Sequence, residues 1–341
     1  MISLVNDYSE GAHPRLLEKI QELNLQANDG YGLDRYCEEA QRLIQRELGV
    51  PAAIHFVVGG TQANLTFLSA ALRPHEAVIS VASGHINVHE TGAIEATGHK
   101  VLVAEGVAGK LTPQGIRKVV LHHEDEHMVQ PRVVYISNAT ELGGVYTKEE
   151  IMNLRAVCDE YNLWLYMDGA RLGNALCSEE NDCTLRDYAH YLDAFTIGGT
   201  KNGALMGEAI VLLHPAIQQD FRFLIKQKGG MLAKGFLLGA QFGELFRDGL
   251  YFQLALHANK MAMKLQKGLL NAGIPLWMYS TTNLLFPILT ATQLAWLEQH
   301  ARFSIWERRD DDRVTVRLVT SWATDETKVD AFLVALQQRE R

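Results

Sequence analysis

The chain alternates short apolar runs with helical patterns, and this alternation constrains its fold more than any other feature. Seven runs rich in β-branched residues predict strands, at residues 53–60, 77–82, 100–106, 132–140, 163–170, 193–199 and 208–214. Helical patterns lie among them at residues 61–72, 89–98, 112–123 and 147–162. Strands that alternate with helices favour a parallel, doubly wound sheet with helices on both faces. We therefore expect an α/β fold.

The last part of the chain has a different pattern. Residues 234–273 predict one or two long helices, and shorter mixed segments follow at residues 284–290, 302–322 and 325–339. Such a mixture is typical of a small α+β domain. We expect a large α/β domain over residues 1–245, which includes the N-terminal segment, and a small C-terminal domain over residues 246–341.

Charge and cysteine content exclude several classes of protein. The net charge of −8 argues against a partner that is a nucleic acid or an anionic membrane, because such binding needs a basic face. The four cysteines form no CxxC pattern, and the N-terminus lacks a basic start followed by an apolar stretch. We expect a cytoplasmic protein with reduced thiols, no membrane span and no metal site.

A glycine-rich turn follows the first predicted strand. Gly59, Gly60 and Thr61 lead directly into a helical pattern. Free N–H groups at a helix N-terminus bind anions, and glycines let a ligand approach closely. The turn predicts a phosphate site, although a tight turn with a helix cap would have the same sequence.

Two charged residues follow two later strands. Asp168 ends the run LWLYMD, and Lys201 follows the run DAFTIGG among glycines. Ligands of open α/β sheets bind at the carboxyl ends of strands. A lysine amine in apolar surroundings becomes nucleophilic and can form a Schiff base with an aldehyde. Alternatively, Asp168 caps a helix or pairs with Arg171, and Lys201 lies on a surface turn.

These signals together match the needs of pyridoxal 5′-phosphate. The turn would bind the phosphate, Asp168 would keep the pyridine nitrogen protonated, and Lys201 would bind the aldehyde carbon. His85 follows another strand and would stack on the ring.

The order of these motifs resembles the low-specificity L-threonine aldolase / β-eliminating lyase group of fold type I pyridoxal-phosphate enzymes. The resemblance extends over nearly the whole chain, in NDYSEGAHP, GYG, GGTQAN, GHINVHETGAIE, MDGARLGNA, GGTKNG and VRLVTSW. It implies the fold of the aspartate aminotransferases, with a large, mostly parallel sheet domain and a small C-terminal domain. It also implies homodimers or homotetramers with active sites between subunits.

The resemblance implies roles for residues that bind the cofactor. Lys201 matches the lysine that binds the cofactor covalently, Asp168 the pyridinium partner and His85 the stacking histidine. Gly60 and Thr61 match the phosphate-binding turn. Arg171 also belongs to the cofactor-binding set.

Further roles concern the substrate. Arg171 and Arg317 match two arginines that bind the substrate carboxylate, which suits the planar guanidinium group. His127 resembles a second active-site histidine near the substrate hydroxyl. Tyr31 resembles an aromatic residue that reaches the site across a subunit boundary.

The chain departs from the family pattern at three places. Asn6 stands where a serine usually contacts the carboxylate. The segment NGALM, residues 202–206, replaces the usual GLGAP after the lysine. Leu232 stands where an arginine is common, so Lys228 or Lys234 would have to supply a cross-subunit phosphate contact.

We therefore expect retro-aldol cleavage of a β-hydroxy-α-amino acid such as L-threonine or L-allo-threonine to glycine and an aldehyde. His85 or His127 would remove the hydroxyl proton. The alternatives are β-elimination or another reaction with the same cofactor, a non-catalytic sensor of amino acids or pyridoxal phosphate, and an α/β binding protein without this cofactor.

Overall fold

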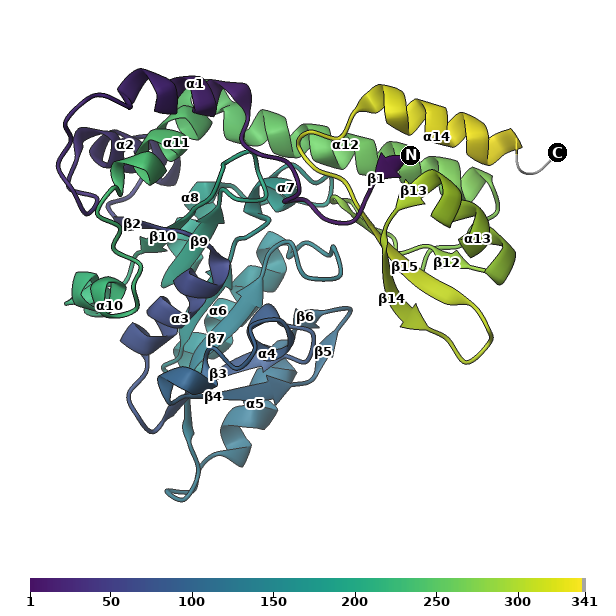
Figure 1. The fold of residues 1–341 in the computed structure, drawn as a ribbon. Coiled ribbons are helices and arrows are strands. Elements are labelled where there is room, and N and C mark those ends of the chain that lie inside the picture. The colour runs from purple at the N-terminus through teal and green to yellow at the C-terminus, as the bar shows by residue number, and fades with distance from the viewer. Residues whose placement is uncertain (339–341) are drawn as a thin grey trace.

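The seven predicted strands form one sheet. In a computed structural model that describes residues 1–338, the spatial order of this sheet is β2-β10-β9-β8-β7-β3-β4 (Figure 1). Its members are β2 (Ala53–Val57), β3 (Glu76–Val81), β4 (Lys100–Ala104), β7 (Gln130–Ser137), β8 (Trp164–Asp168), β9 (Ala194–Gly198) and β10 (Glu208–Leu212). Strand β10 runs antiparallel to both of its neighbours, whereas β4, β3, β7, β8 and β9 pair in parallel. The predicted sheet is confirmed.

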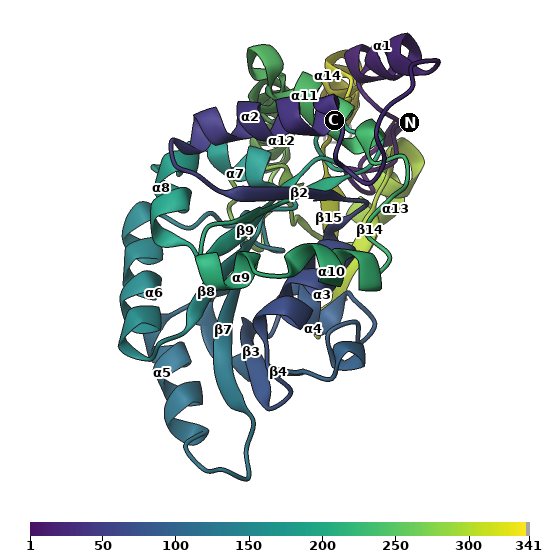
Figure 2. The ribbon, with the colours of Figure 1, turned by 90° about the vertical axis from the view of Figure 1, so that its left-hand side faces the viewer.

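Helices cover both faces of this sheet, as Figure 2 shows. Side chains on one face pack with α2 (Arg35–Leu48), α5 (Pro113–His122), α6 (Lys148–Glu160) and α8 (Leu185–Tyr191). The opposite face packs with α3 (Gly60–Ala71), α9 (Pro215–Gln218) and α10 (Phe221–Gln227). Residues alternate between the two cores: on β10, Ala209 and Val211 face the first core, and Ile210 and Leu212 face the second. This period of two explains why the buried strands have continuous apolar sequences.

The C-terminal part forms a second sheet and core. Its strands are β11 (Leu284–Leu285), β12 (Ile288–Leu289), β14 (Ser304–Arg308) and β15 (Val314–Val319). They pack with α12 (Leu250–Asn271), α13 (Ala291–His300) and α14 (Glu326–Gln338). Residue 339, the end of the helix expected at 325–339, lies outside the described residues.

The N-terminal segment differs from expectation. Strand β1 (Ile2–Ser3) pairs in parallel with β13 (Ala301–Arg302), and Ile2 and Leu4 are buried in the C-terminal core. Burial of these two apolar side chains places residues 2–4 with the small core and not with the large one. The division of the chain at residues 245 and 246 stays a prediction.

Left-handed backbone angles decide between one and two helices at residues 234–273 and explain one further difference. Residues 234–273 form two helices, α11 (Phe236–Phe246) and α12, because Asp248 and Gly249 adopt left-handed backbone angles in the turn η2 (Arg247–Gly249). The helix expected at 89–98 is wrong: α4 (His85–Val88) ends before it, and only η1 (Glu95–Thr97) is helical. Thr91 and Gly92 have positive φ angles, which interrupt a helix.

The remaining elements are α1 (Pro14–Leu23), α7 (Leu172–Leu176), β5 (Gly106–Val107) and β6 (Lys110–Leu111). Within residues 1–338, no helix combines the length and the apolar character needed to cross a membrane.

Candidate active site

A cavity of about 300 Å³ opens at the carboxyl ends of β7 and β8. It lies where the N-terminus of α3, the loop after β9 and the start of β10 also meet. Six residues predicted from the sequence line it: Gly60, Thr61, His85, Asp168, Arg171 and Lys201. The topology brings together residues that are up to 141 positions apart (from 60 to 201), since the strand ends share one edge of the sheet.

Lys201 lies on the loop between β9 and β10. Burial lowers the pKa of its amine, and the nearby guanidinium of Arg171 lowers it further, against the opposing effect of Asp7, Asp168 and Glu208. A lowered pKa leaves more of the amine uncharged, and the uncharged amine is the nucleophile. Because Lys201 lines the cavity, it is part of the cavity wall and not of a surface turn.

The unusual segment after Lys201 has a structural role. The side-chain amide of Asn202 donates to the carbonyl of Tyr251 at 2.8 Å, and the N–H of Gly207 donates to Thr200 Oγ1 at 3.0 Å. Gly203 has a φ of 90°, which a side chain would disfavour. These contacts fix the loop that carries Lys201.

Asp168 is the last residue of β8 and is buried. Its Oδ2 accepts from Asn64 Nδ2 and from the hydroxyl of Tyr135, both at 2.8 Å, and its Oδ1 accepts from the N–H of Ala170 at 2.9 Å. Burial would raise the pKa of this carboxyl, but His85, Asn64, Ala170 and Lys201 outweigh that effect and lower it. Asp168 is thus an ionised carboxylate in the interior, suited to a cationic ring nitrogen.

His85 begins α4, and a buried carboxyl group holds its ring. Its Nδ1 lies 2.7 Å from Glu90 Oε1, which also accepts from Asn64 Nδ2 at 2.8 Å. A carboxyl oxygen that already accepts from Asn64 is the acceptor of this bond too, so its hydrogen lies on Nδ1, and Nε2 is the ring nitrogen that this bond leaves free. Asn64 therefore links the carboxyl groups of Glu90 and Asp168.

The same three groups could in principle surround a metal ion. Ligand atoms of His85, Glu90 and Asp168 lie within 4.8 Å of one another. However, the amide of Asn64 donates to both carboxyl groups, so the structure holds them together by hydrogen bonds.

The turn before α3 is open toward a ligand. Gly59 is the N-cap and provides no side-chain hydrogen bond, and a Cβ built on Gly59 or Gly60 meets no atom of residues 1–338 within 4 Å. The first N–H groups of a helix have no acceptor within the helix. These groups and the glycine surface suit an anion such as a phosphate.

Arg171 is held by a residue that the sequence did not indicate. Its Nε and Nη2 donate to the two oxygens of Asp7 at 2.7 and 3.1 Å, and Asn283 Nδ2 donates to Asp7 Oδ2 at 2.9 Å. The alternative pairing of Arg171 with Asp168 is therefore wrong. Arg317, on β15 of the second sheet, lies close enough to Arg171 that burial and this like charge lower its pKa. A substrate carboxylate would relieve the repulsion between the two guanidinium groups.

Four predicted site residues do not line this cavity: Asn6, Tyr31, His127 and Arg317. Asn6 Oδ1 accepts from the N–H of Tyr8 at 3.0 Å and from Ser9 Oγ at 2.8 Å, so it shapes the turn that places Tyr8 in the cavity wall. His127 is exposed in the loop before β7, and Ser137, at the other end of β7, lines the cavity. Strand β7 has eight residues and is about 26 Å long, and this length separates His127 from the cavity of its own chain.

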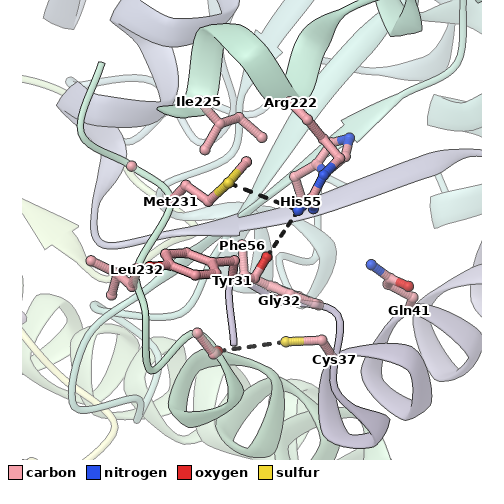
Figure 3. A pocket seen from close by; sticks show the side chains of 12 residues that line it. Tyr31, Gly32, Cys37, Gln41, His55, Phe56, Arg222, Ile225, Met231 and Leu232 are labelled. Carbon is pink, nitrogen blue, oxygen red and sulfur yellow. Dashed lines mark hydrogen bonds between the residues drawn. The ribbon is translucent and has the colours of Figure 1, made fainter. Parts of the chain in front are cut away.

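Tyr31 lies at a second pocket, around His55 and Arg222 (Figure 3). This pocket has a volume of about 30 Å³, room for about one water molecule and not for a cofactor. Tyr31 is 46% exposed, and its carbonyl accepts from Arg222 Nη2 at 3.2 Å. Leu232 lines the same pocket, whereas Lys228 and Lys234 do not line the cavity around Lys201.

Glu90, Asn64, Asp7, Glu141 and Glu208 were not identified from the sequence. Glu141 Oε1 accepts from Ser137 Oγ at 2.6 Å and from the N–H of His85 at 3.1 Å, and burial raises the pKa of this carboxyl. The available sequence signal was that Asp7, Asn64 and Glu90 occur inside the quoted motifs NDYSEGAHP, GGTQAN and GHINVHETGAIE.

The chain is similar in sequence to known proteins over most of its length. The family model described as "Beta-eliminating lyase" matches residues 11–292. The low specificity L-threonine aldolase of Pseudomonas sp. (strain NCIMB 10558) is 34% identical over 287 residues, covering 83% of this chain and 80% of the relative. That of Pseudomonas aeruginosa is 32% identical over 285 residues, with the same two coverages.

Solved structures extend the comparison. A threonine aldolase of Leishmania major has 47% identity and a TM-score of 0.98, over 100% of both chains. An aspartate aminotransferase of Thermus thermophilus has a TM-score of 0.69 at 15% identity, over 99% of this chain and 91% of that one, and shows a shared fold alone.

Proposed function

Because this chain belongs to the beta-eliminating lyase family, we propose that it is a pyridoxal 5′-phosphate-dependent aldolase. It cleaves β-hydroxy-α-amino acids such as L-threonine and L-allo-threonine to glycine and an aldehyde. The observation that carries this proposal is the convergence of Lys201, Asp168 and the turn at Gly60 on one cavity of about 300 Å³.

The residues present fit the cofactor. Lys201 offers an amine with a lowered pKa, Asp168 offers a buried carboxylate for the ring nitrogen, and Gly60 with Thr61 offers an open anion site. Pyridoxal 5′-phosphate supplies an electron-deficient ring that accepts the electron pair of the broken Cα–Cβ bond.

Two arginines orient the substrate. Arg171, just before α7, and Arg317, on β15, lie close enough for their like charges to interact, and an amino-acid carboxylate between them would be bound by both. The ion pair with Asp7 holds Arg171 in place, and Asn283 holds Asp7. The reacting bond of the substrate is thereby positioned over the cofactor-binding residues.

His85 removes the proton of the substrate hydroxyl in this proposal. Its Nε2 is the free acceptor because Glu90 fixes the hydrogen on Nδ1. His127 would need to come from a second copy of the chain to reach a cavity, and the same holds for Tyr31. Their roles, and a homodimer or homotetramer that would supply them, remain predictions. All four cysteines are free, which supports the proposed cytoplasmic location.

Absorption spectra before and after addition of L-threonine test the function. We expect the absorbance of the bound cofactor to change and acetaldehyde to be trapped in amounts equal to glycine. A Lys201→Ala control loses the absorbance of the lysine-bound cofactor and should release no aldehyde. An unchanged spectrum without aldehyde would contradict the aldolase, and pyruvate from cysteine would favour β-elimination. Full biological activity of Lys201→Ala would favour a sensor.

A further inference from the structure

Glu208 is a buried carboxyl group in the cavity wall that the proposed reaction does not use. It is the first residue of β10, pairs with Val57 of β2 and Gly198 of β9, and is 2% exposed. Because Val57 lies two residues before Gly59, this pairing places Glu208 beside the glycine turn. Glu208 lines the same cavity as Gly59, Gly60 and Thr200.

The pattern of β10 shows which face Glu208 occupies. Ile210 and Leu212 pack in the core beneath α3. Alternate residues of a strand face the same side of the sheet, so the side chain of Glu208, two residues before Ile210, also lies on the α3 side. Tyr166 packs in that core too, which places Asp168, two residues later on β8, on this face. The carboxyl groups of Glu208 and Asp168 therefore share one side of the sheet and line the same cavity.

The charges around Glu208 favour its neutral form. Burial raises the pKa of its carboxyl well above the ordinary value, Asp168 raises it further, and only Lys201 opposes them. The other titratable groups that sense it are the hydroxyls of Tyr166 and Tyr251. Among residues 1–338, Glu208 Oε2 has no hydrogen-bond partner. A buried polar atom without a partner is costly unless a ligand satisfies it.

We propose that Glu208 is a neutral carboxylic acid that donates a hydrogen bond to the phosphate group of the cofactor. This proposal rests on the phosphate site assigned above to the Gly60–Thr61 turn. The helix N-terminus provides N–H groups from one side of the phosphate, and Glu208 provides an O–H from the neighbouring strand. An ionised carboxylate in this place would repel the phosphate, whereas a carboxylic acid kept neutral by its surroundings is a donor.

Binding of two cofactor forms to the apoprotein tests the proposal. Pyridoxal 5′-phosphate and pyridoxal share the ring and the aldehyde, so the ratio of their Kd values isolates the phosphate contact. Glu208→Ala should reduce the preference for the phosphorylated form by about tenfold or more, the effect of one hydrogen bond to a charged group. Glu208→Gln should keep most of the preference, because its amide N–H is still a donor.

The pH dependence separates a donor from a structural residue. In the natural protein the preference should fall as the pH rises through the raised pKa of Glu208, because its carboxyl group loses its proton there. In Glu208→Gln the preference should not show this fall. Glu141→Gln is the matched control: it alters another buried carboxyl of the same cavity and should leave the preference at the natural level.

Two results would overturn the proposal. One is an equal loss of preference in the alanine and glutamine variants; the other is equal weakening of both cofactor forms by Glu208→Ala. Melting temperatures of the apoproteins show whether a variant is folded, and the isosteric glutamine variant keeps the test valid if the alanine variant is not. These assays need no turnover, so absence of aldehyde release would contradict the proposed function without affecting this result.

Discussion

Replacement of Glu90 by alanine should slow the cleavage of L-threonine through its effect on His85. Glu90 Oε1 is the acceptor for both His85 Nδ1, at 2.7 Å, and Asn64 Nδ2, at 2.8 Å, and its side chain is 0% exposed. Without it, His85 is free to rotate and to carry its hydrogen on either nitrogen. Fewer molecules then present the Nε2 acceptor to the substrate hydroxyl.

The magnitude follows from the hydrogen bond that is lost. A hydrogen bond to a charged partner is worth about 1.5–3 kcal/mol, which corresponds to about 10- to 160-fold in rate. Glu90→Gln can keep an oxygen in the position of Oε1 and loses only the charge. Because charge-assisted bonds are about twice as strong as neutral ones, we expect a loss of about fivefold for this variant.

Initial rates of acetaldehyde release, measured with saturating pyridoxal 5′-phosphate, provide the assay. We expect the loss in kcat and little change in KM, because Arg171 and Arg317 hold the substrate carboxylate independently of Glu90. Comparison of Glu90→Ala, His85→Asn and the double variant completes a double-mutant cycle. If Glu90 acts through His85, its removal should have little further effect in the His85→Asn background. A full and additive loss in that background would refute the reasoning.

Two further predictions concern stability and the cofactor site. Burial and Arg222 lower the pKa of His55 from 6.5 to about 4, so protonation of this histidine opposes folding. The free energy of unfolding should therefore fall by up to about 3 kcal/mol as the pH decreases from about 6.5 to about 4. Urea unfolding at both ends of the window should show a smaller fall in His55→Gln, and an identical fall would contradict this cause. A Cβ at Gly198 would lie 2.8 Å from Ala170 Cα, so Gly198→Ala should displace the N–H that holds Asp168 and lower the bound cofactor per chain. In the control Gly243→Ala the new Cβ meets no atom of residues 1–338 within 4 Å, and cofactor content equal in both variants would exclude the proposed displacement.

The site was predictable where a residue is marked by its position next to a strand. Asp168 and Lys201 follow apolar runs, and Gly60 follows a third, so the sequence predicted that all three meet at one edge of a parallel sheet. The family resemblance then indicated the cofactor, and the relatives agree with it. The unusual segment after Lys201 could not be interpreted before the contact of Asn202 with the carbonyl of Tyr251 was visible.

The supporting residues were not predictable, because their partners are distant in sequence. Asn64 and Asp168 are 104 positions apart, and Asp7 and Arg171 are 164 apart. Nothing in a local pattern distinguishes these polar residues from those that face solvent. The prediction of a helix at 89–98 was wrong although a local helical pattern was present. Thr91 and Gly92 adopt left-handed backbone angles, which a helix of these residues cannot contain.

The sequence by itself determined the layers of the fold, because the spacing of apolar residues sets which faces of strands and helices can be buried. It also determined which chemical groups stand at strand ends. Only the tertiary structure decided which carboxyl groups are charged and what they hold. Asp168 is surrounded by donors and is ionised, whereas Glu208, on the same face of the sheet, has an oxygen without a donor among residues 1–338 and a pKa that burial and Asp168 raise. The two carboxyl groups differ because ionisation depends on the neighbours that folding brings into contact, and a linear sequence does not contain those distances.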